Sequence, residues 1–408
     1  MAEQKYDLYS SDFREQTYET YSAMRADDPV FRQPGLDGET PIWFVTRHED
    51  ALAVLLDDER FVLDAALALT PEELEEREEA AGALLDPRVN THLLTVDGDD
   101  HRRLRRLVSK AFTPRMVEGL RPRIQAIADE LIDAVEPHGE MNLVDDFAFP
   151  LPIVVICELL GIPSEDRDRF RAWSNLFVSP ALSEEDQRAF VVAIEEFLAY
   201  LHELFEQRRA EPGDDLVSGL VQAEEAGDML SENELFSMVV LLIVAGHETT
   251  VSLIGNSVLA LLEHPDELEK LRAEPDRFPE AVEELLRFDS PVERSITRWA
   301  ATDVQVGSQT IRRGELVIAV IGSANRDHER FPEADRLDLA RGDSKHLGFG
   351  RGPHFCLGAP LARLEAEIAL RVLFARLPSL RLAIEEKDLY WRPIPLFRSL
   401  SALPVAWD

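Results

Sequence analysis

The sequence is poor in cysteine, in positive charge and in long apolar runs, and each shortage excludes a class of protein. Two cysteines among 408 residues are too few for a disulfide framework, so we expect a reducing compartment. Lysine and arginine number 43 against 78 acidic residues, a formal net charge of −35, which disfavours binding to nucleic-acid phosphates. The longest apolar run, Met238 to Gly246, is about half of the ~20 residues that a membrane span needs.

The sequence also shows no signal of a targeting segment or of an interdomain linker. The beginning of the sequence, MAEQKYDLYSSDF, is polar and mixed in charge, unlike a signal peptide or membrane anchor. No stretch rich in proline, glycine and serine divides the chain, and its 45% hydrophobic content is ample for a large core. We therefore expect a cytoplasmic protein in which residues 1–408 form a single domain.

Helical periodicity covers most of the chain. The clearest helix begins after Ser231, where Ser231-Glu232-Asn233-Glu234 has the form of a capping box, and it ends before Pro265. A helix so long and so apolar must cross the interior of the protein. The fold class is mainly α with minor β. Apolar spacing and turn residues predict further helices at 121–135, 186–209 and 279–288, and short strands at 304–306 and 316–321.

Cys356 lies in a glycine-rich loop, FGRGPHFCLG, at positions 349–358. Its glycines let the backbone approach a large flat ligand closely. Pro360 follows in what reads as the first turn of a helix, and a helix N-terminus stabilises a thiolate. A thiolate binds iron and donates electron density that helps to break an O–O bond. Cys157, in an apolar stretch, reads instead as a buried structural cysteine.

The loop resembles the haem-binding loop of the cytochromes P450, which reads F-G-x-G-x-H-x-C-x-G in many bacterial members, and every fixed position is present here. The resemblance implies the P450 fold, a triangular helical prism with a long central helix over the haem and a small β-rich lobe. It implies haem b (iron protoporphyrin IX), with Cys356 as the iron ligand and with Gly350 and Gly358 beside the cofactor. It is closest to soluble bacterial members that hydroxylate macrolides, polyketides, steroids or fatty acids.

A carboxylate within the long apolar helix also needs an explanation, because burying it is costly. It belongs to the segment Ala245-Gly246-His247-Glu248-Thr249-Thr250. A zinc motif fails because Val251 stands where the second histidine should be. By resemblance, Glu248 and Thr249 are the catalytic acid–alcohol pair that relays protons, Ala245 leaves room beside the haem, and the helix backbone loosens locally. The alternative is a solvated or internally bonded pair, since threonine can bond the carbonyl one turn back.

Glu284 and Arg287 are three residues apart and share a helix face. They match the family's E-x-x-R motif, whose role is structural, beneath the haem. The third partner in the family is an arginine of the following meander. Arg336 and Arg341 are both candidates, and the sequence does not choose between them.

A basic stretch from His101 to Arg123 stands out in this acidic chain. His101 and Arg105 face the same way on a helix and match the family's H-x-x-x-R, which contacts haem propionates. Arg298 and His354 match two further propionate contacts, since carboxylates inside a protein need cationic or hydrogen-bonding partners. The remaining cations are either a solvated helix face or a docking patch for an acidic electron donor such as a ferredoxin, namely Arg102, Arg103, Arg106, Lys110, Arg351 and Arg363.

The reaction that the resemblance implies inserts one oxygen atom of O2 into a C–H bond and reduces the other to water. Two electrons come from NAD(P)H through separate ferredoxin and reductase proteins, because no flavin domain or Rossmann fingerprint is visible. We expect a monomer with a lipophilic substrate and with neither nucleic acid nor membrane as partner. The pocket is expected to draw on the stretch from Leu176 to Val191 and on the wall residues Leu94, Ala245, Val292, Ile296 and Phe397.

Two rival functions fit the same loop. One is a peroxide-dependent haem-thiolate enzyme, in which an Arg-Pro pair often replaces the acid–alcohol pair. The other is a non-catalytic haem-binding or recruitment protein of the same fold, which tends to lose that pair. Retention of Glu248 and Thr249 argues against both.

Overall fold

The computed structural model describes residues 5–408 except 82–86, 167–168, 171, 174–175, 177–182, 226–227 and 343–344. Part of the stretch expected to line the pocket, residues 177–182, therefore lies outside the described residues. The α-helices are α1 (Ser11–Glu15), α2 (Thr17–Asp27), α3 (His48–Leu56), α4 (Pro71–Ala81), α5 (Pro87–Asn90), α6 (Gly98–Ala111), α7 (Pro114–Gly119), α8 (Arg121–Val135), α9 (Pro150–Leu160), α11 (Glu184–Ala210), α12 (Leu216–Val221), α13 (Glu232–Glu263), α14 (Pro265–Ala273), α15 (Phe278–Phe288), α16 (Ile321–Ala324) and α17 (Ala359–Arg376). The strands are β1 (Val30–Pro34), β2 (Pro41–Val45), β3 (Phe61–Val62), β4 (Glu140–Asn142), β5 (Glu224–Glu225), β6 (Asp228–Met229), β7 (Arg298–Ala300), β8 (Val304–Val306), β9 (Gln309–Ile311), β10 (Leu316–Ala319), β11 (Arg381–Leu382) and β12 (Pro404–Ala406).

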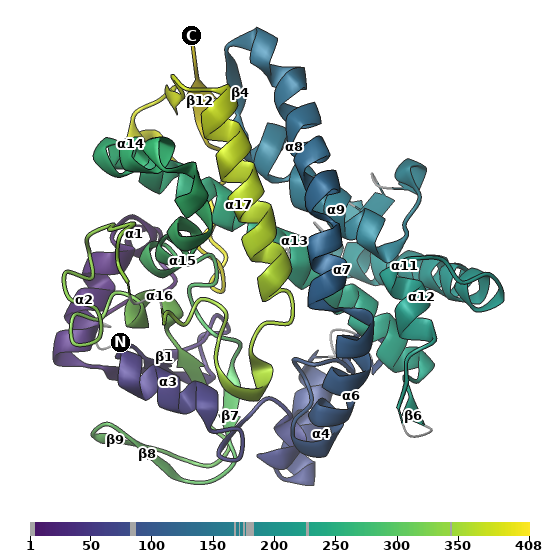
Figure 1. Ribbon diagram of the computed structural model, residues 1–408. Helices are drawn as coiled ribbons and strands as arrows, with labels where there is room; N and C mark the ends of the chain where they lie inside the picture. The colour runs from purple at the N-terminus through teal and green to yellow at the C-terminus, as the bar shows by residue number, and fades with distance from the viewer. Residues whose placement is uncertain are drawn as a thin grey trace.

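The long helix α13 is the central element, as predicted. The Ser231 hydroxyl accepts from the backbone N–H of Glu234, whose carboxylate accepts from the Ser231 N–H at 2.7 Å. The helix contacts α5, α9, α15 and α17 and passes behind α17 and α8 in the view of Figure 1. It is long and apolar enough to cross a membrane, but 61% of its most apolar window is buried inside the protein. Its hydrophobicity is therefore used for internal packing.

The β-structure is concentrated in a lobe with α2, α3 and α16, at the lower left of Figure 1. Its five strands lie in the order β1-β2-β10-β7-β3, with β2 and β10 parallel and the other neighbours antiparallel. The predicted strand at 304–306 is β8. The strand predicted at 316–321 ends at Ala319, because the chain turns into α16 at Ile321.

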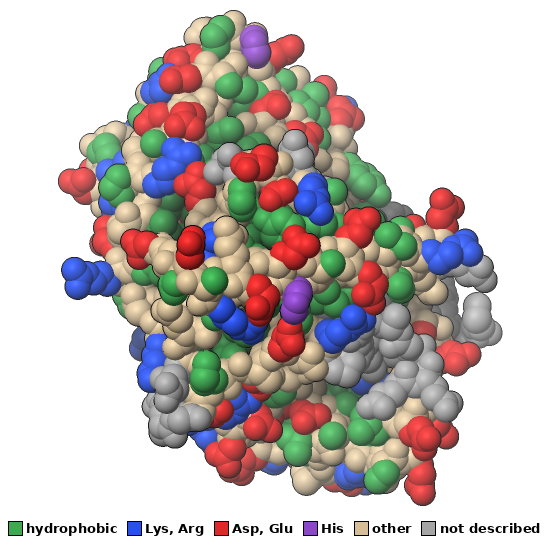
Figure 2. Space-filling view, turned by 90° about the vertical axis from the view of Figure 1, so that its right-hand side faces the viewer, with side chains coloured by type: hydrophobic (Ala, Val, Ile, Leu, Met, Phe, Trp, Pro, Cys, Tyr) green, Lys and Arg blue, Asp and Glu red, His purple; other side chains and the backbone are tan. Residues whose placement is uncertain are grey.

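Buried apolar side chains form one large cluster and two smaller ones. The large cluster joins side chains of α6, α8, α9, α11, α13, α15 and α17. A second cluster belongs to the five-stranded sheet and α3, and a third joins the first two helices to Phe44 on β2. Figure 2 shows acidic side chains spread over one face of the molecule, in keeping with the net charge of −35.

Candidate active site

The cysteine loop has a backbone that only glycine adopts easily at two positions. Gly350 and Gly352 have φ of 68° and 75°, in the left-handed region, and a Cβ at Gly352 would lie 3.1 Å from the Leu55 carbonyl oxygen. The Cys356 N–H donates to the Phe349 carbonyl at 2.9 Å. The loop is thus wrapped tightly, directly before Gly358, the N-cap of α17.

The thiol of Cys356 is exposed, whereas Cys157 is buried in the core as predicted. The residue is exposed as a whole, yet the surrounding protein desolvates its sulfur. This desolvation raises the pKa of the thiol, while the N–H groups of Gly358 and Ala359 and the guanidinium of Arg105 act to lower it. The helix N-terminus therefore favours the thiolate, as expected, but desolvation outweighs it. A metal ion that binds the sulfur would supply the remaining stabilisation of the thiolate.

The residues predicted to bind propionates meet beside this loop. The rings of His101 on α6 and His354 are 4.1 Å apart, and the buried Nε2 of His101 has no hydrogen-bond partner among the described residues. Arg298 on β7 is buried and donates to the Phe61 carbonyl at 3.0 Å. Within the described ranges neither Arg298 nor the half-buried Arg105 forms an ion pair. Desolvation lowers the pKa of both guanidinium groups.

Two desolvated guanidinium groups and an unsatisfied imidazole nitrogen indicate that an anionic group belongs here, because buried cations are costly without a partner. The sequence missed the residue that organises the cluster. Asp97, the N-cap of α6, accepts from His354 Nε2 at 3.1 Å and from the backbone N–H groups of Leu63 and Asp64. Asp97 precedes His101 by four residues, and this spacing could have indicated that the two side chains lie close together. The donor set fits the two propionates of a haem.

On α13 the predicted acid and alcohol are both bonded, but not to each other. The Thr249 hydroxyl donates to the Ala245 carbonyl at 2.9 Å, the internal bond that the alternative interpretation named. The Glu248 carboxylate is buried, with Oε2 2.8 Å from Arg392 and Oε1 3.6 Å from His247 Nε2. The expected loosening of the backbone is not found, since α13 is a continuous helix through Ala245 to Thr249.

The Glu248 carboxyl is held ionised although it is buried. Desolvation raises its pKa, but the hydrogen bond and charge of His247 and the charge of Arg392 outweigh this and keep the pKa below the usual value. Arg392 was not predicted from the sequence. It comes from the C-terminal segment, which carries no motif.

The predicted wall residues are partly brought together. Val292 and Phe397 form an isolated antiparallel bridge. Ala245 on α13 is exposed and Leu94 is half-buried. Ile296, 36% exposed, is a large apolar side chain open to solvent. The exposed Ala245 and Ile296 are compatible with a lipophilic ligand.

The E-x-x-R pair forms a fully buried ion pair on α15. Arg287 donates to both oxygens of Glu284 at 2.7 and 2.8 Å and to the carbonyls of Asn325, Ala334 and Arg336. Arg341 donates to Glu284 at 3.1 Å. The third side chain is therefore Arg341, and Arg336 contributes its backbone carbonyl.

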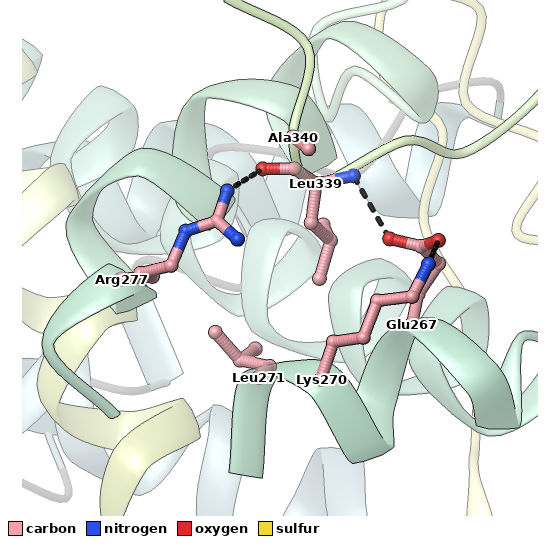
Figure 3. Close-up of a pocket in the computed structure, with 6 residues that line it drawn as sticks. All are labelled: Glu267, Lys270, Leu271, Arg277, Leu339 and Ala340. Atoms are coloured by element: carbon pink, nitrogen blue, oxygen red, sulfur yellow. Dashed lines mark hydrogen bonds and ion pairs between the residues drawn. The ribbon is translucent and has the colours of Figure 1, made fainter. Parts of the chain in front are cut away.

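The same meander is fastened at a small cavity, whose lining residues are shown in Figure 3. Arg277 donates to the Leu339 carbonyl at 2.9 Å, and the Leu339 N–H donates to Glu267 at 3.1 Å. Lys270 pairs with the same glutamate at 2.6 Å. None of the predicted site residues lines this cavity, so it anchors the meander rather than forming the active site.

The cations expected to dock an electron donor differ in their surroundings. Arg103 pairs with the buried Glu234, and Arg363 donates to both oxygens of Glu283 at 2.6 and 2.9 Å. Arg102 pairs with Asp99, and Arg351 donates to the His346 carbonyl. Arg102, Arg106 and Lys110 are exposed, whereas Arg103, Arg351 and Arg363 are half-buried.

Known proteins resemble the chain over nearly its whole length. Residues 61–377 match the family model described as Cytochrome P450. The chain is 47% identical to Cytochrome P450 107B1 of Saccharopolyspora erythraea, over 96% of this chain and 95% of that protein. It is 44% identical to vitamin D(3) 25-hydroxylase of Pseudonocardia autotrophica, over 98% and 96% of the two chains.

Solved structures agree with this. Cytochrome P450 PksS of the bacillaene polyketide synthase of Bacillus subtilis superposes with a TM-score of 0.91 at 40% identity, covering 99% of this chain and 100% of that one. The predicted P450 fold is thereby confirmed. The family implies a haem-iron cofactor, and its bacterial members generally use lipophilic substrates and ferredoxin-type electron donors. The exposed cysteine, the cationic cluster and the whole-length likeness lead to one conclusion: the chain belongs to the cytochrome P450 family and is a P450 monooxygenase.

Proposed function

We propose that this protein uses haem b to insert one oxygen atom of O2 into a C–H bond of a lipophilic small molecule of the macrolide or polyketide, steroid or fatty-acid class. The observation that carries the proposal is an exposed cysteine beside the buried Arg298 and the half-buried Arg105, neither of which forms an ion pair among the described residues. A haem would satisfy both features, because its iron would bind the thiolate and its two propionate groups would pair with the cations. The balanced reaction is RH + O2 + NAD(P)H + H⁺ giving ROH + H2O + NAD(P)⁺.

The residues that would hold the cofactor come from both sides of the site. Cys356 binds the iron, and Gly350 and Gly358 let the backbone lie close to the ring. The haem, when bound, supplies the redox and oxygen chemistry, and the protein supplies position and protons. The propionate partners are His101, Arg105, Arg298 and His354, and Ala245 leaves space on the opposite side.

Proton transfer to the pocket is carried out by two residues of α13. The ionised Glu248 carboxylate accepts a proton that arrives from solvent. The Thr249 hydroxyl, now bonded to the Ala245 carbonyl, holds a proton at Oγ1 and presents it to the pocket. Each turnover consumes two protons and two electrons beyond the oxygen molecule and the substrate, and Glu248 and Thr249 together would deliver these protons.

Electrons reach the site from outside the chain. We infer a ferredoxin-type donor and its NAD(P)H reductase, with contact at the cations of α6 that are exposed, Arg102, Arg106 and Lys110. Complementary charges raise the rate of encounter with an acidic donor. Residues 1–408 act as one cytoplasmic, monomeric catalytic domain.

The reduced carbon-monoxide spectrum for which the family is named tests the ligand. Wild type should give it and Cys356→Ala should not; a persisting band in the variant sinks the ligand assignment. Spectral titration with steroids, fatty acids and macrolide precursors then selects a substrate. Product made with isotope-labelled O2 and the electron-transfer proteins should carry the label. Label from added peroxide alone would favour the peroxide-dependent enzyme, and haem binding without turnover of any bound ligand would favour the non-catalytic protein.

A further inference from the structure

The carboxylate of Glu248 accepts a hydrogen bond from a part of the chain that lies outside α13. Arg392, 144 residues further along, donates to Oε2 at 2.8 Å. The Glu248 side chain is 3% exposed and that of Arg392 is 29% exposed. The bond therefore joins a buried carboxylate to a cation that reaches in from the surface.

Arg392 belongs to a short C-terminal hairpin, defined here as residues 391–400. Trp391 pairs with Leu400, and the Arg392 N–H donates to the Ser399 carbonyl at 2.8 Å. Phe397 lies in the turn of this hairpin and bridges to Val292. Both are proposed wall residues of the substrate pocket.

The hairpin is fastened to α13 at a second point. Asn256 on α13 donates to the Arg398 carbonyl at 2.9 Å. Asn256 lies two turns of helix beyond Glu248. The segment that touches the proposed substrate pocket is thus bonded to the proposed proton-carrying helix on both sides of the hairpin.

We propose that Arg392 is a positioning residue, which holds Glu248 as a directed carboxylate and couples the pocket-lining hairpin to proton delivery. The inference rests on the proposed function of Glu248. Arg392 itself touches neither substrate nor cofactor in this scheme. It acts through the glutamate, whose direction depends on where the hairpin holds the guanidinium group.

The charges around Glu248 determine how its pKa should change when Arg392 is removed. Among the described residues, the charged and titratable groups that face it are His247 of its own helix and Arg392 of the hairpin. An opposite charge at this range lowers a carboxyl pKa by about 1–3 units. Loss of Arg392 therefore raises the pKa of Glu248, so that more of the side chain is protonated at a given pH and fewer molecules accept a proton from solvent.

The test compares the holoenzyme of wild type and Arg392→Met with reductase, ferredoxin and the substrate found by titration. We expect the acid limb of the pH profile of product formed per NAD(P)H to move up by about 1 unit or more. The substrate Kd and the reduced carbon-monoxide spectrum should stay the same. Arg392→Lys should restore most of the wild-type profile. An unmoved acid limb in Arg392→Met would overturn the proposal.

A double-variant cycle separates this inference from the function on which it rests. Glu248→Gln should abolish the acid limb, and adding Arg392→Met to it should then change nothing further. If Glu248→Gln leaves coupling and pH profile unaltered, the proposed relay itself fails. If Glu248→Gln has its effect but Arg392→Met lowers coupling equally with and without Glu248, the relay stands and the positioning role is wrong.

Unfolding of the holoenzyme supplies a measurement that does not depend on turnover. The lowered pKa of Glu248 means that the ion pair stabilises the fold above the unfolded-state pKa of about 4.3 and loses this effect as the pH falls. The Tm difference between wild type and Arg392→Met should therefore be largest near neutral pH and shrink in acid, and it should lose this pH dependence in the Glu248→Gln background. Persistence there would count against the pair.

A matched variant on the same hairpin tests whether Arg392 merely holds the hairpin. Arg398 pairs with Asp289 at 2.8 Å and stacks on Trp391. Arg398→Met should lower the Tm as well but should not move the acid limb of coupling. If it reproduces the shift seen in Arg392→Met, hairpin anchoring explains the effect and the proposal fails. If Arg392→Met does not accumulate as holoenzyme, Arg392→Gln takes its place with the same expected shift.

Discussion

Replacing Arg287 on α15 with methionine should destabilise the protein more than replacing either arginine of the meander, Arg336 or Arg341. Arg287 and Glu284 are 0% and 2% exposed, and the guanidinium also serves three backbone carbonyls. Its removal leaves the buried Glu284 with Arg341 and the Asp338 N–H alone. Breaking a buried pair on one side costs about 3–5 kcal/mol of unfolding free energy.

Two other arginines of the same network give a graded comparison. Arg341→Met removes one charged hydrogen bond to Glu284, which is expected to cost about 1.5–3 kcal/mol. It also removes bonds to the carbonyls of Pro332, Glu333 and Arg336, which lie on the exposed side of the meander. Arg336 uses its backbone carbonyl in the network, and its side chain, 56% exposed, pairs only with the exposed Glu333 among the described residues. Arg336→Met should therefore change the unfolding free energy by about 0–1 kcal/mol.

Urea unfolding of the three holoenzymes, followed by far-ultraviolet circular dichroism at one pH and protein concentration, measures this order. The expected ranking of the loss is Arg287→Met, then Arg341→Met, then Arg336→Met. Haem absorbance recorded in parallel shows whether the cofactor leaves in the same transition. An Arg336→Met variant as unstable as Arg341→Met would refute the assignment of the third partner. An Arg287→Met variant whose free energy of unfolding equals that of wild type would refute the buried-pair argument.

Three further predictions concern the site. Thr249→Ala should uncouple NAD(P)H and oxygen consumption from product, whereas Thr249→Ser, which keeps the hydroxyl, should stay coupled; full coupling in the alanine variant, measured as product per NAD(P)H, would exclude the relay. Arg106→Glu with Lys110→Glu should slow reduction by the ferredoxin and flatten its dependence on salt; stopped-flow rates identical to wild type would remove the docking surface. Asp97→Asn should weaken haem retention. Since desolvation of Asp97 is outweighed by His354 and two backbone donors, which lower its pKa, its stabilising effect should be present at neutral pH and fade in acid; an Asp97→Asn Tm deficit that is constant with pH would contradict this.

Local signals in the sequence accounted for the elements that carry the chemistry. The capping box at Ser231 and the proline at 265 gave both ends of α13, and the glycines of the cysteine loop gave its turns. These features depend on neighbours within a few residues, where periodicity and capping rules apply. They do not depend on how distant parts of the chain meet.

Remote partners that belong to no motif of the resemblance were not predicted. Arg392 is 144 residues from Glu248, and Asp97 is 257 residues from His354. Arg103 was counted as a surface charge, yet it is neutralised by Glu234, 131 positions away. Such pairings follow from the packing of the lobes, and no pattern within a window of sequence contains that information.

The proposed contacts of the cofactor are divided among elements with separate cores. Arg298 lies on β7 of the sheet lobe, while His101 and Cys356 lie on α6 and ahead of α17 in the helical cluster. A ligand held by both bodies is thermodynamically linked to their docking, because it stabilises the docked form by an amount that grows with its free concentration. Cells that make this chain faster than haem should accumulate a species in which the sheet lobe and the helical cluster are folded but the interface between them is not firmly packed. In this species the amide hydrogens of β7 and α6 should exchange faster than those of α13. Haem supply would then govern the yield of native protein as well as its activity.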